Sequence, residues 1–185
     1  LLHKFGLREH HHVLDFGCGS LRLGRMLLPY LLPQRYFGIE PNGWLVEKGF
    51  LYETGQDIRT IKQPSFSYDS AFDCTVFGRQ FDFIVAQSII THTGRSEAQT
   101  LFESASRALL DSGVFLFSFA ADEKLGPPAP LTGWIYPDCV SFTHADLDEF
   151  CAKAGLSWKT LDWHHPGATW AVAARSRDNL LPKAS

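Results

Sequence analysis

The chain has 185 residues, enough to enclose one sizeable hydrophobic core and too few for two comfortable domains. Hydrophobic residues make up 45% and charged residues 20%, as in an ordinary soluble globular protein. The formal net charge of −3 argues against a dedicated nucleic-acid binder, which usually carries a basic surplus. No apolar run approaches the roughly 20 residues that span a bilayer.

We expect a cytoplasmic protein with reduced thiols, because the chain opens without a signal-peptide layout and its four cysteines include no CxxC pair. The cysteines therefore indicate neither a zinc site nor a disulfide framework, and we expect no metal. The chain begins at Leu1 instead of Met, close to the first predicted strand, so we expect that an N-terminal segment is missing. The sequence does not indicate an oligomeric state.

Apolar runs alternate with helical patterns in the first third of the chain. Residues 12–16 predict a short buried strand. Ser20 is a suitable N-cap for an amphipathic helix that Pro29 would kink and Pro33 would end. Residues 36–40 predict the second strand, and residues 44–52 a short helix.

The middle of the chain is regular only from residue 81 onward. Residues 53–80 indicate little beyond a short strand at 65–68. The run "FDFIVA" at 81–86 predicts a strand, and apolar residues from Ala98 to Leu109 predict an amphipathic helix ended by "DSG" at 111–113. Residues 114–119 predict another buried strand, which a Gly/Pro-rich loop at 125–133 follows.

Thr143 and Asp146 form a capping pair for a last helix, which Gly155 would end. Two β-rich runs, 156–163 and 169–175, are joined too closely for a crossover, so we expect an antiparallel hairpin at one edge. The whole pattern predicts one α/β domain: a Rossmann-like open, mostly parallel sheet with helices on both faces and a C-terminal antiparallel β-hairpin. In such sheets a ligand lies at the carboxyl ends of the strands.

The stretch "HVLDFGCGSLRLGR", residues 12–25, carries the clearest chemical signal. Gly17 and Gly19 allow a ligand close to the backbone, and the following helix offers free N–H groups to an anion. A dinucleotide fingerprint needs a third glycine where Arg22 stands, and Asp15 would repel a pyrophosphate. A ligand with a carboxylate and an ammonium group, such as an amino-acid moiety, suits this turn better.

Four stretches in order, "VLDFGCGS", "YFGIEPN", "FDFIVAQSIITH" and "LLDSGVFLFSF", resemble the successive motifs of class I S-adenosylmethionine-dependent methyltransferases. The resemblance covers roughly residues 12–175. It implies S-adenosylmethionine as the cofactor and transfer of its methyl group to an acceptor. It departs from the family at Leu21, where a glycine is common, and in the atypical third-strand region; we expect Leu21 to begin the helix without a positive φ.

The resemblance also implies roles for individual residues. Gly17, Cys18 and Gly19 would lie along the methionine part of the cofactor, with Asp15 near its ammonium group, directly or through water. Glu40 would accept hydrogen bonds from both ribose hydroxyls. The other implied cofactor contacts are Pro41 and Asn42 beside the adenine and ribose, Asp69 or Asp73 at the adenine amino group, and Gln87 and Ser88 at the methionine and methyl end.

His92, at the end of "SIITH", has two readings. It shapes the loop through bonds to the backbone, or it acts as a general base on an acceptor that must lose a proton. Trp134 and Tyr136 follow the Pro-rich loop and are candidates to line a substrate pocket. The run His10–His12 precedes the first strand at its amino end, and we expect it to be solvated.

The sequence thus predicts methyl transfer from S-adenosylmethionine to a small molecule by in-line displacement, with no nucleic-acid or membrane partner. One alternative is a binding module that keeps the cofactor site without turnover. The other is a nicotinamide-dependent oxidoreductase, which shares the sheet and the acid after the second strand. The acceptor and the attacked atom are left open.

Overall fold

The computed structural model describes residues 1–121 and 125–183. Its centre is a seven-stranded sheet with the strand order β3-β2-β1-β4-β5-β7-β6. Pairing is parallel from β3 to β5, whereas β7 runs antiparallel to both of its neighbours. The strands are β1 (Val13–Phe16), β2 (Tyr36–Ile39), β3 (Ser65–Ser67), β4 (Phe81–Ala86), β5 (Leu109–Phe119), β6 (Ser157–Thr160) and β7 (Thr169–Ala174).

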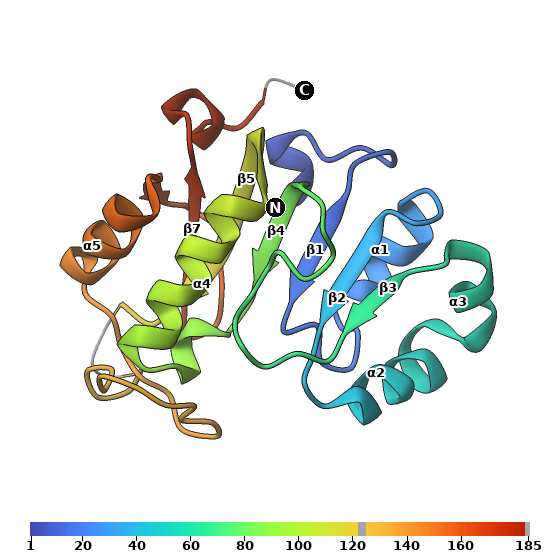
Figure 1. The fold of residues 1–185 in the computed structure, drawn as a ribbon, viewed down its shortest axis with the longest axis horizontal. Helices are drawn as coiled ribbons and strands as arrows, with labels where there is room; N and C mark the ends of the chain where they lie inside the picture. Colours follow the sequence, from blue (N-terminus) through green and yellow to red (C-terminus); the bar gives the residue numbers. More distant parts are fainter. Residues whose placement is uncertain (122–124, 184–185) are drawn as a thin grey trace.

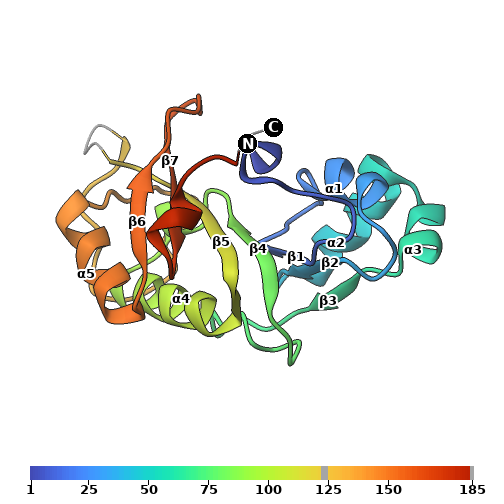
Figure 2. The same ribbon diagram turned by 90° about the horizontal axis from the view of Figure 1, so that it is seen from above.

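Helices cover both faces of the sheet, as Figure 2 shows from above. Two of them, α4 (Arg95–Ala108) and α5 (His144–Ala154), cover one face; in Figure 1, α4 lies in front of the sheet at β5 and α5 lies to its left. The other face carries α1 (Gly24–Tyr30), α2 (Gly43–Gly49) and α3 (Gln56–Lys62). The short helical segments are η1 (Leu2–Phe5), the π-helical η2 (Phe50–Thr54), η3 (Ile90–His92) and η5 (Arg177–Leu180). No helix in these two ranges is long and apolar enough to cross a membrane.

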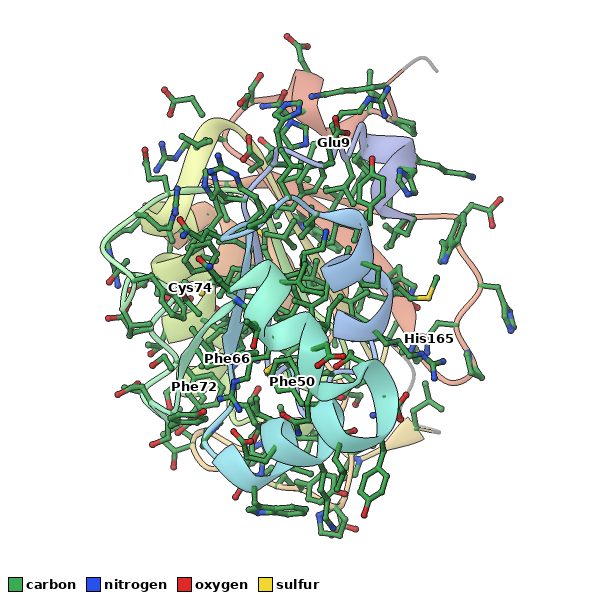
Figure 3. The ribbon with its side chains drawn as sticks, turned by 90° about the vertical axis from the view of Figure 1, so that its right-hand side faces the viewer. Glu9, Phe50, Phe66, Phe72, Cys74 and His165 are labelled. Atoms are coloured by element: carbon green, nitrogen blue, oxygen red, sulfur yellow. The ribbon has the colours of Figure 1, made fainter. Side chains whose placement is uncertain are left out.

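The two faces bury two separate apolar clusters, because alternate residues of a strand point to opposite sides. In β1, Leu14 and Phe16 belong to the cluster beneath α4 and α5, while Val13 belongs to the cluster beneath α1. Phe50 and Phe66, labelled in Figure 3, pack edge to face at the β3 end, with ring centroids 5.7 Å apart. The predicted fold class is therefore confirmed, including the antiparallel pair β6 and β7.

Two element boundaries and one whole helix differ clearly from the sequence-based predictions. The first helix begins at Gly24, with no side-chain cap, instead of after Ser20. The reason is that Leu21 has a φ of +61°, which a right-handed helix cannot contain. The predicted stop "DSG" at 111–113 lies inside β5, which starts at Leu109. The helix α3 was not predicted, and no residue of it is buried.

The C-terminal half follows its local signals closely. The Thr143 side chain accepts a hydrogen bond from the Asp146 N–H, and the Asp146 carboxylate accepts from the Thr143 N–H, so the predicted capping box is present. Gly155 ends α5 with a φ of +68°. Residues 125–143 return from β5 to α5 past the edge where the parallel strands end (Figure 1).

Candidate cofactor-binding site

A cavity of about 330 Å³ opens at the carboxyl ends of β1 and β2. This is the edge where ligands bind in open α/β sheets. Its wall is mostly apolar and brings together segments from four parts of the chain. The lining residues are Phe16, Gly17, Ile39, Glu40, Pro41, Asn42, Asp69, Ser70, Phe72, Ile89 and Trp134.

The glycine turn after β1 forms the floor of the cavity at Gly17. Gly17 and Gly19 have φ values of +73° and +51°, which are cheap only for glycine. A Cβ at Gly17 would collide with the side chain of Ile89, so the turn and the segment after β4 approach closely. The expectation for Leu21 was wrong, because this residue also takes a positive φ while its side chain is fully buried.

Glu40 joins the two turns that border the cavity. It follows β2 directly and is only 8% exposed. One carboxylate oxygen accepts a hydrogen bond from the Gly19 N–H at 3.1 Å, and the other accepts from the Asn42 N–H at 2.9 Å. These bonds fix the orientation of the carboxylate, and the side chain still lines the cavity.

Asp15 lies behind the glycine turn and is not part of the cavity wall. It is 3% exposed, and its Oδ2 accepts a hydrogen bond from the Tyr36 hydroxyl at 2.7 Å. Burial, aided by the nearby carboxylate of Glu40, raises the pKa of Asp15 to about 7, although the Tyr36 bond works in the opposite direction. Its predicted approach to an ammonium group stays a prediction.

The two candidate acids of the third-strand region are separated by the structure. Asp69 lines the cavity, and its Oδ1 accepts from the Ala71 N–H at 2.6 Å. Asp73 lies outside the cavity wall, where its Oδ1 accepts from the Thr75 N–H and hydroxyl. The Thr75 hydroxyl lowers the pKa of Asp73. Of these two acids, Asp69 is the one that lines the cavity.

The remaining predicted contacts lie outside the cavity wall. Cys18 is 6% exposed, and burial raises the pKa of its thiol well above the ordinary value, which disfavours a nucleophilic thiolate. Gln87 lines a separate hollow of about 100 Å³ together with Leu1 and Trp170. Ser88 has a φ of +57°, and its N–H donates to the Ser118 hydroxyl at 2.7 Å.

Sequence reasoning missed most of the apolar wall. Phe16 and Ile39 end their strands and were given no role in the site, and Ile89 lies inside one of the quoted motifs without a role of its own. Phe72, labelled in Figure 3, comes from the irregular segment that follows β3. Its ring packs on Phe16 with centroids 5.7 Å apart, a contact that no local pattern indicates. Trp134 was a candidate, and it reaches the cavity from the loop after β5.

His92 is held by the same loop. Its Nδ1 lies 2.7 Å from the carbonyl oxygen of Asp138, and its ring contacts the Trp134 and Tyr136 rings. Within the described ranges, no group of three or more His, Cys, Asp or Glu side chains is arranged to hold a metal ion. The geometry therefore offers an apolar cavity with one fixed carboxylate, one further acid and a glycine turn.

No protein-family model and no curated protein matches the sequence. Comparison of the fold with solved structures gives many matches. One is the magnesium protoporphyrin IX methyltransferase ChlM from Synechocystis PCC 6803 with bound SAH, at 18% identity and a TM-score of 0.66, covering 95% of this chain and 78% of that one.

Two further matches have the same architecture. A DhpI-SAM-HEP complex shares 18% identity at a TM-score of 0.66, over 91% of this chain and 80% of that one. An S-adenosylmethionine-dependent methyltransferase from Clostridium acetobutylicum shares 12% identity at a TM-score of 0.68, over 88% and 83%. The fold is that of the class I S-adenosylmethionine-dependent methyltransferases.

Proposed function

We propose that this protein binds S-adenosylmethionine in the cavity and transfers its methyl group to a small-molecule acceptor by in-line displacement. The observation that carries the proposal is the placement of the Glu40 carboxylate. This carboxylate stands at the end of β2 on the wall of an otherwise apolar cavity, and it is already oriented by the Gly19 and Asn42 N–H groups. A fixed carboxylate at this point suits the two vicinal hydroxyls of a ribose.

The cavity wall matches the remaining parts of the cofactor. Pro41 and Asn42 would border the adenine on one side, and Phe72 and Ile89 on the other, with Asp69 accepting from the adenine amino group. The methionine part would run along Gly17, Cys18 and Gly19 toward Gln87 and Ser88, with Asp15 behind the turn. When bound, S-adenosylmethionine supplies a methyl group already activated by its positively charged sulfur.

The main task of the chain is then alignment. The hydrogen bonds of Glu40 and the tight contact of Gly17 with Ile89 set the site before a ligand arrives. Removing translational and rotational freedom in advance lowers the barrier of a bimolecular displacement without any acid or base. A base is required only for an acceptor that must lose a proton.

The strand order argues against the nicotinamide alternative. The usual dinucleotide-binding sheet has six parallel strands in the order 3-2-1-4-5-6. Here β7 is inserted antiparallel between β5 and β6, and Arg22 occupies the position of the third fingerprint glycine. A module that binds the cofactor without turnover shares every feature above except an acceptor site.

The proposal is tested by calorimetric titration with S-adenosylhomocysteine. We expect one binding site in the wild type and a loss of about 1.5–3 kcal/mol, roughly tenfold or more in affinity, for Glu40→Gln. The amide keeps the size of the side chain but loses the charge that strengthens the bonds to the ribose. The matched control is Glu47→Gln, an exposed acid on α2 that pairs with Arg59. An unchanged dissociation constant for Glu40→Gln, or binding of NAD instead, would contradict the proposal.

A further inference from the structure

Three rings form a continuous aromatic surface at the mouth of the cavity. They belong to His92, Trp134 and Tyr136, here called the aromatic rim. The His92 ring centroid lies 5.8 Å from that of Trp134 and 5.3 Å from that of Tyr136, and the last two rings are inclined by only 20° at 6.4 Å. Trp134 belongs to the cavity wall as well, so the rim continues directly from the cavity.

The rim is exposed although it is apolar. Trp134 is 53% and Tyr136 is 65% exposed, and the neighbouring Leu131 is 75% exposed. Contiguous exposed apolar side chains beside a cavity mark a binding surface more often than chance exposure does. The position of the rim, between the cavity and solvent, is where a second ligand would meet the first.

The backbone that displays these rings is firmly attached to the segment after β4. The Ile135 N–H donates to the His92 carbonyl at 2.7 Å, and the Val140 N–H donates to the Thr91 carbonyl at 2.8 Å. The Gly94 N–H donates to the Gly133 carbonyl at 2.7 Å. Because these bonds order the loop in advance, binding on the rim costs little conformational entropy.

The size of the cavity places the acceptor on the rim. Ligand pockets usually enclose about 300–1,000 Å³, and this cavity, at about 330 Å³, is at the lower end of that range. The nucleoside part of the cofactor would occupy most of such a volume, with the methionine part along the glycine turn, so a second molecule has to bind outside the cavity. Aromatic side chains bind flat rings best, by stacked or edge-to-face contacts.

His92 adds a proton acceptor to this surface. A carbonyl oxygen can only accept, so Nδ1 carries a proton in the contact with Asp138, and in the neutral form of the ring the lone pair is on Nε2. In the described part of the chain no residue hydrogen-bonds this Nε2. An imidazole that is held through Nδ1 beside a ligand surface can use Nε2 as a general base.

We propose that the aromatic rim binds a planar aromatic acceptor that carries a hydroxyl group, and that His92 takes the hydroxyl proton; this rests on the proposed function. The acceptor O–H bond breaks and its proton moves to Nε2 of His92. The oxygen lone pair forms the new O–CH₃ bond, and the electron pair of the broken C–S bond returns to sulfur. The products are an aryl methyl ether, a neutral thioether and an imidazolium that releases its proton to water.

Binding to the rim is tested apart from turnover, with 2-naphthol as the probe and calorimetry as the measurement. We expect the wild type to bind 2-naphthol and Trp134→Leu to bind it about tenfold more weakly. Trp44→Leu is the matched control, because Trp44 is 58% exposed and is not among the residues that line the cavity. Equal affinity of wild type and Trp134→Leu, or equal binding of the saturated decahydro-2-naphthol, would overturn the proposal. So would preferential binding of a quaternary ammonium probe.

The role of His92 is tested with His92→Asn, whose side-chain amide retains a donor toward the Asp138 carbonyl and lacks Nε2. We expect S-adenosylhomocysteine to bind as in the wild type and 2-naphthol to bind a few-fold more weakly, because one ring of the rim is lost, while the turnover rate at saturating 2-naphthol falls about hundredfold. The loss should be much smaller for 4-nitro-1-naphthol, whose hydroxyl ionises by itself. An equal loss of methylation rate for both acceptors, or no loss, would show that His92 is not the general base.

The two proposals fail in different ways. If the wild type does not bind S-adenosylhomocysteine, the proposed function is wrong, whatever the naphthol titration shows. If S-adenosylhomocysteine binds and depends on Glu40 but 2-naphthol binds independently of Trp134, only the acceptor assignment is wrong.

Discussion

Asp15 and His12 have pKa shifts in opposite directions within one stretch of chain. The pKa of Asp15 is raised to about 7, chiefly by burial. His12 lies directly before β1. Its pKa is lowered to about 4, first by burial and then by the guanidinium groups of Arg79 and Arg35. Arg79 donates to His12 Nε2 at 2.6 Å, and Arg35 contacts the same atom. The expected solvated run was therefore wrong for His12, whose ring is enclosed by two arginines and Asp82.

These shifts predict how stability varies with pH. The unfolded chain ionises Asp15 near pH 4, whereas the folded protein keeps it protonated up to about pH 7. The contribution of Asp15 to the free energy of unfolding is therefore fully present below pH 4 and is lost as the pH rises to 7. The contribution of His12 to the free energy of unfolding is fully present above about pH 6.5 and is lost as the pH falls toward 4. Between these values the two slopes oppose each other.

We expect Asp15→Asn to make the opposition visible. Relative to the wild type, its free energy of unfolding should rise by a few kcal/mol as the pH goes from 4 to 7, because the amide has no charge to bury. Urea denaturation at several pH values measures the difference. A difference that is constant over this range would show that Asp15 is ionised in the folded protein.

Leu21 shows two opposing effects within one residue. A left-handed conformation costs a non-glycine residue roughly 1–2 kcal/mol. Complete burial of a leucine side chain contributes about 1.5–3 kcal/mol. Leu21 is 0% exposed and packs against Gly49 of α2, so burial offsets the backbone strain. The side chain thereby connects the glycine turn to α2 by packing.

At the scale of elements, Gly49 is the residue at which α2 contacts the glycine turn. A Cβ at Gly49 would lie 2.7 Å from the Ser20 carbonyl oxygen and 2.7 Å from Cγ of Leu21. The carbonyl is backbone and cannot swing away, so the turn itself would have to shift. This contact couples the packing of a helix to the shape of the binding site.

We expect Gly49→Ala to lower the free energy of unfolding by about 1–3 kcal/mol through overpacking. It should also weaken S-adenosylhomocysteine binding several-fold, because the turn moves. Gly43→Ala is the control within α2, since the atoms nearest to its Cβ would belong to the ring of Tyr68, which is half exposed and can rotate. Thermal denaturation and calorimetry measure the two effects. Wild-type affinity in a destabilised Gly49→Ala would disprove the coupling.

Elements with a strong local signal were predictable from the sequence, and those set by tertiary contacts were not. The Thr143 capping box and the "FDFIVA" strand carry their own chemistry and were found with their boundaries. The helix α3 has seven residues and none of them is fully buried, so its sequence carries too short a pattern to indicate a helix. In the site, Glu40 followed from its strand end, whereas Phe72 enters the cavity through long-range packing on Phe16.

At the scale of the whole molecule, the sheet order brings the parts of the site together. Residues from the ends of β1, β2 and β4 meet at one edge because these strands are adjacent and parallel. The antiparallel β7 beside β5 completes the sheet, whose fold is similar to that of the matched methyltransferase structures. The loop after β5 then places Trp134 over the same edge, 94 positions after Glu40 (134 − 40).

The most direct test of the account is a crystal structure of the protein with S-adenosylhomocysteine. The account predicts the ribose hydroxyls at the Glu40 carboxylate, the adenine between Asn42 and Phe72, and the sulfur directed toward the aromatic rim. A nucleoside bound elsewhere, or a cavity that the protein's own side chains fill in the presence of saturating ligand, would contradict it.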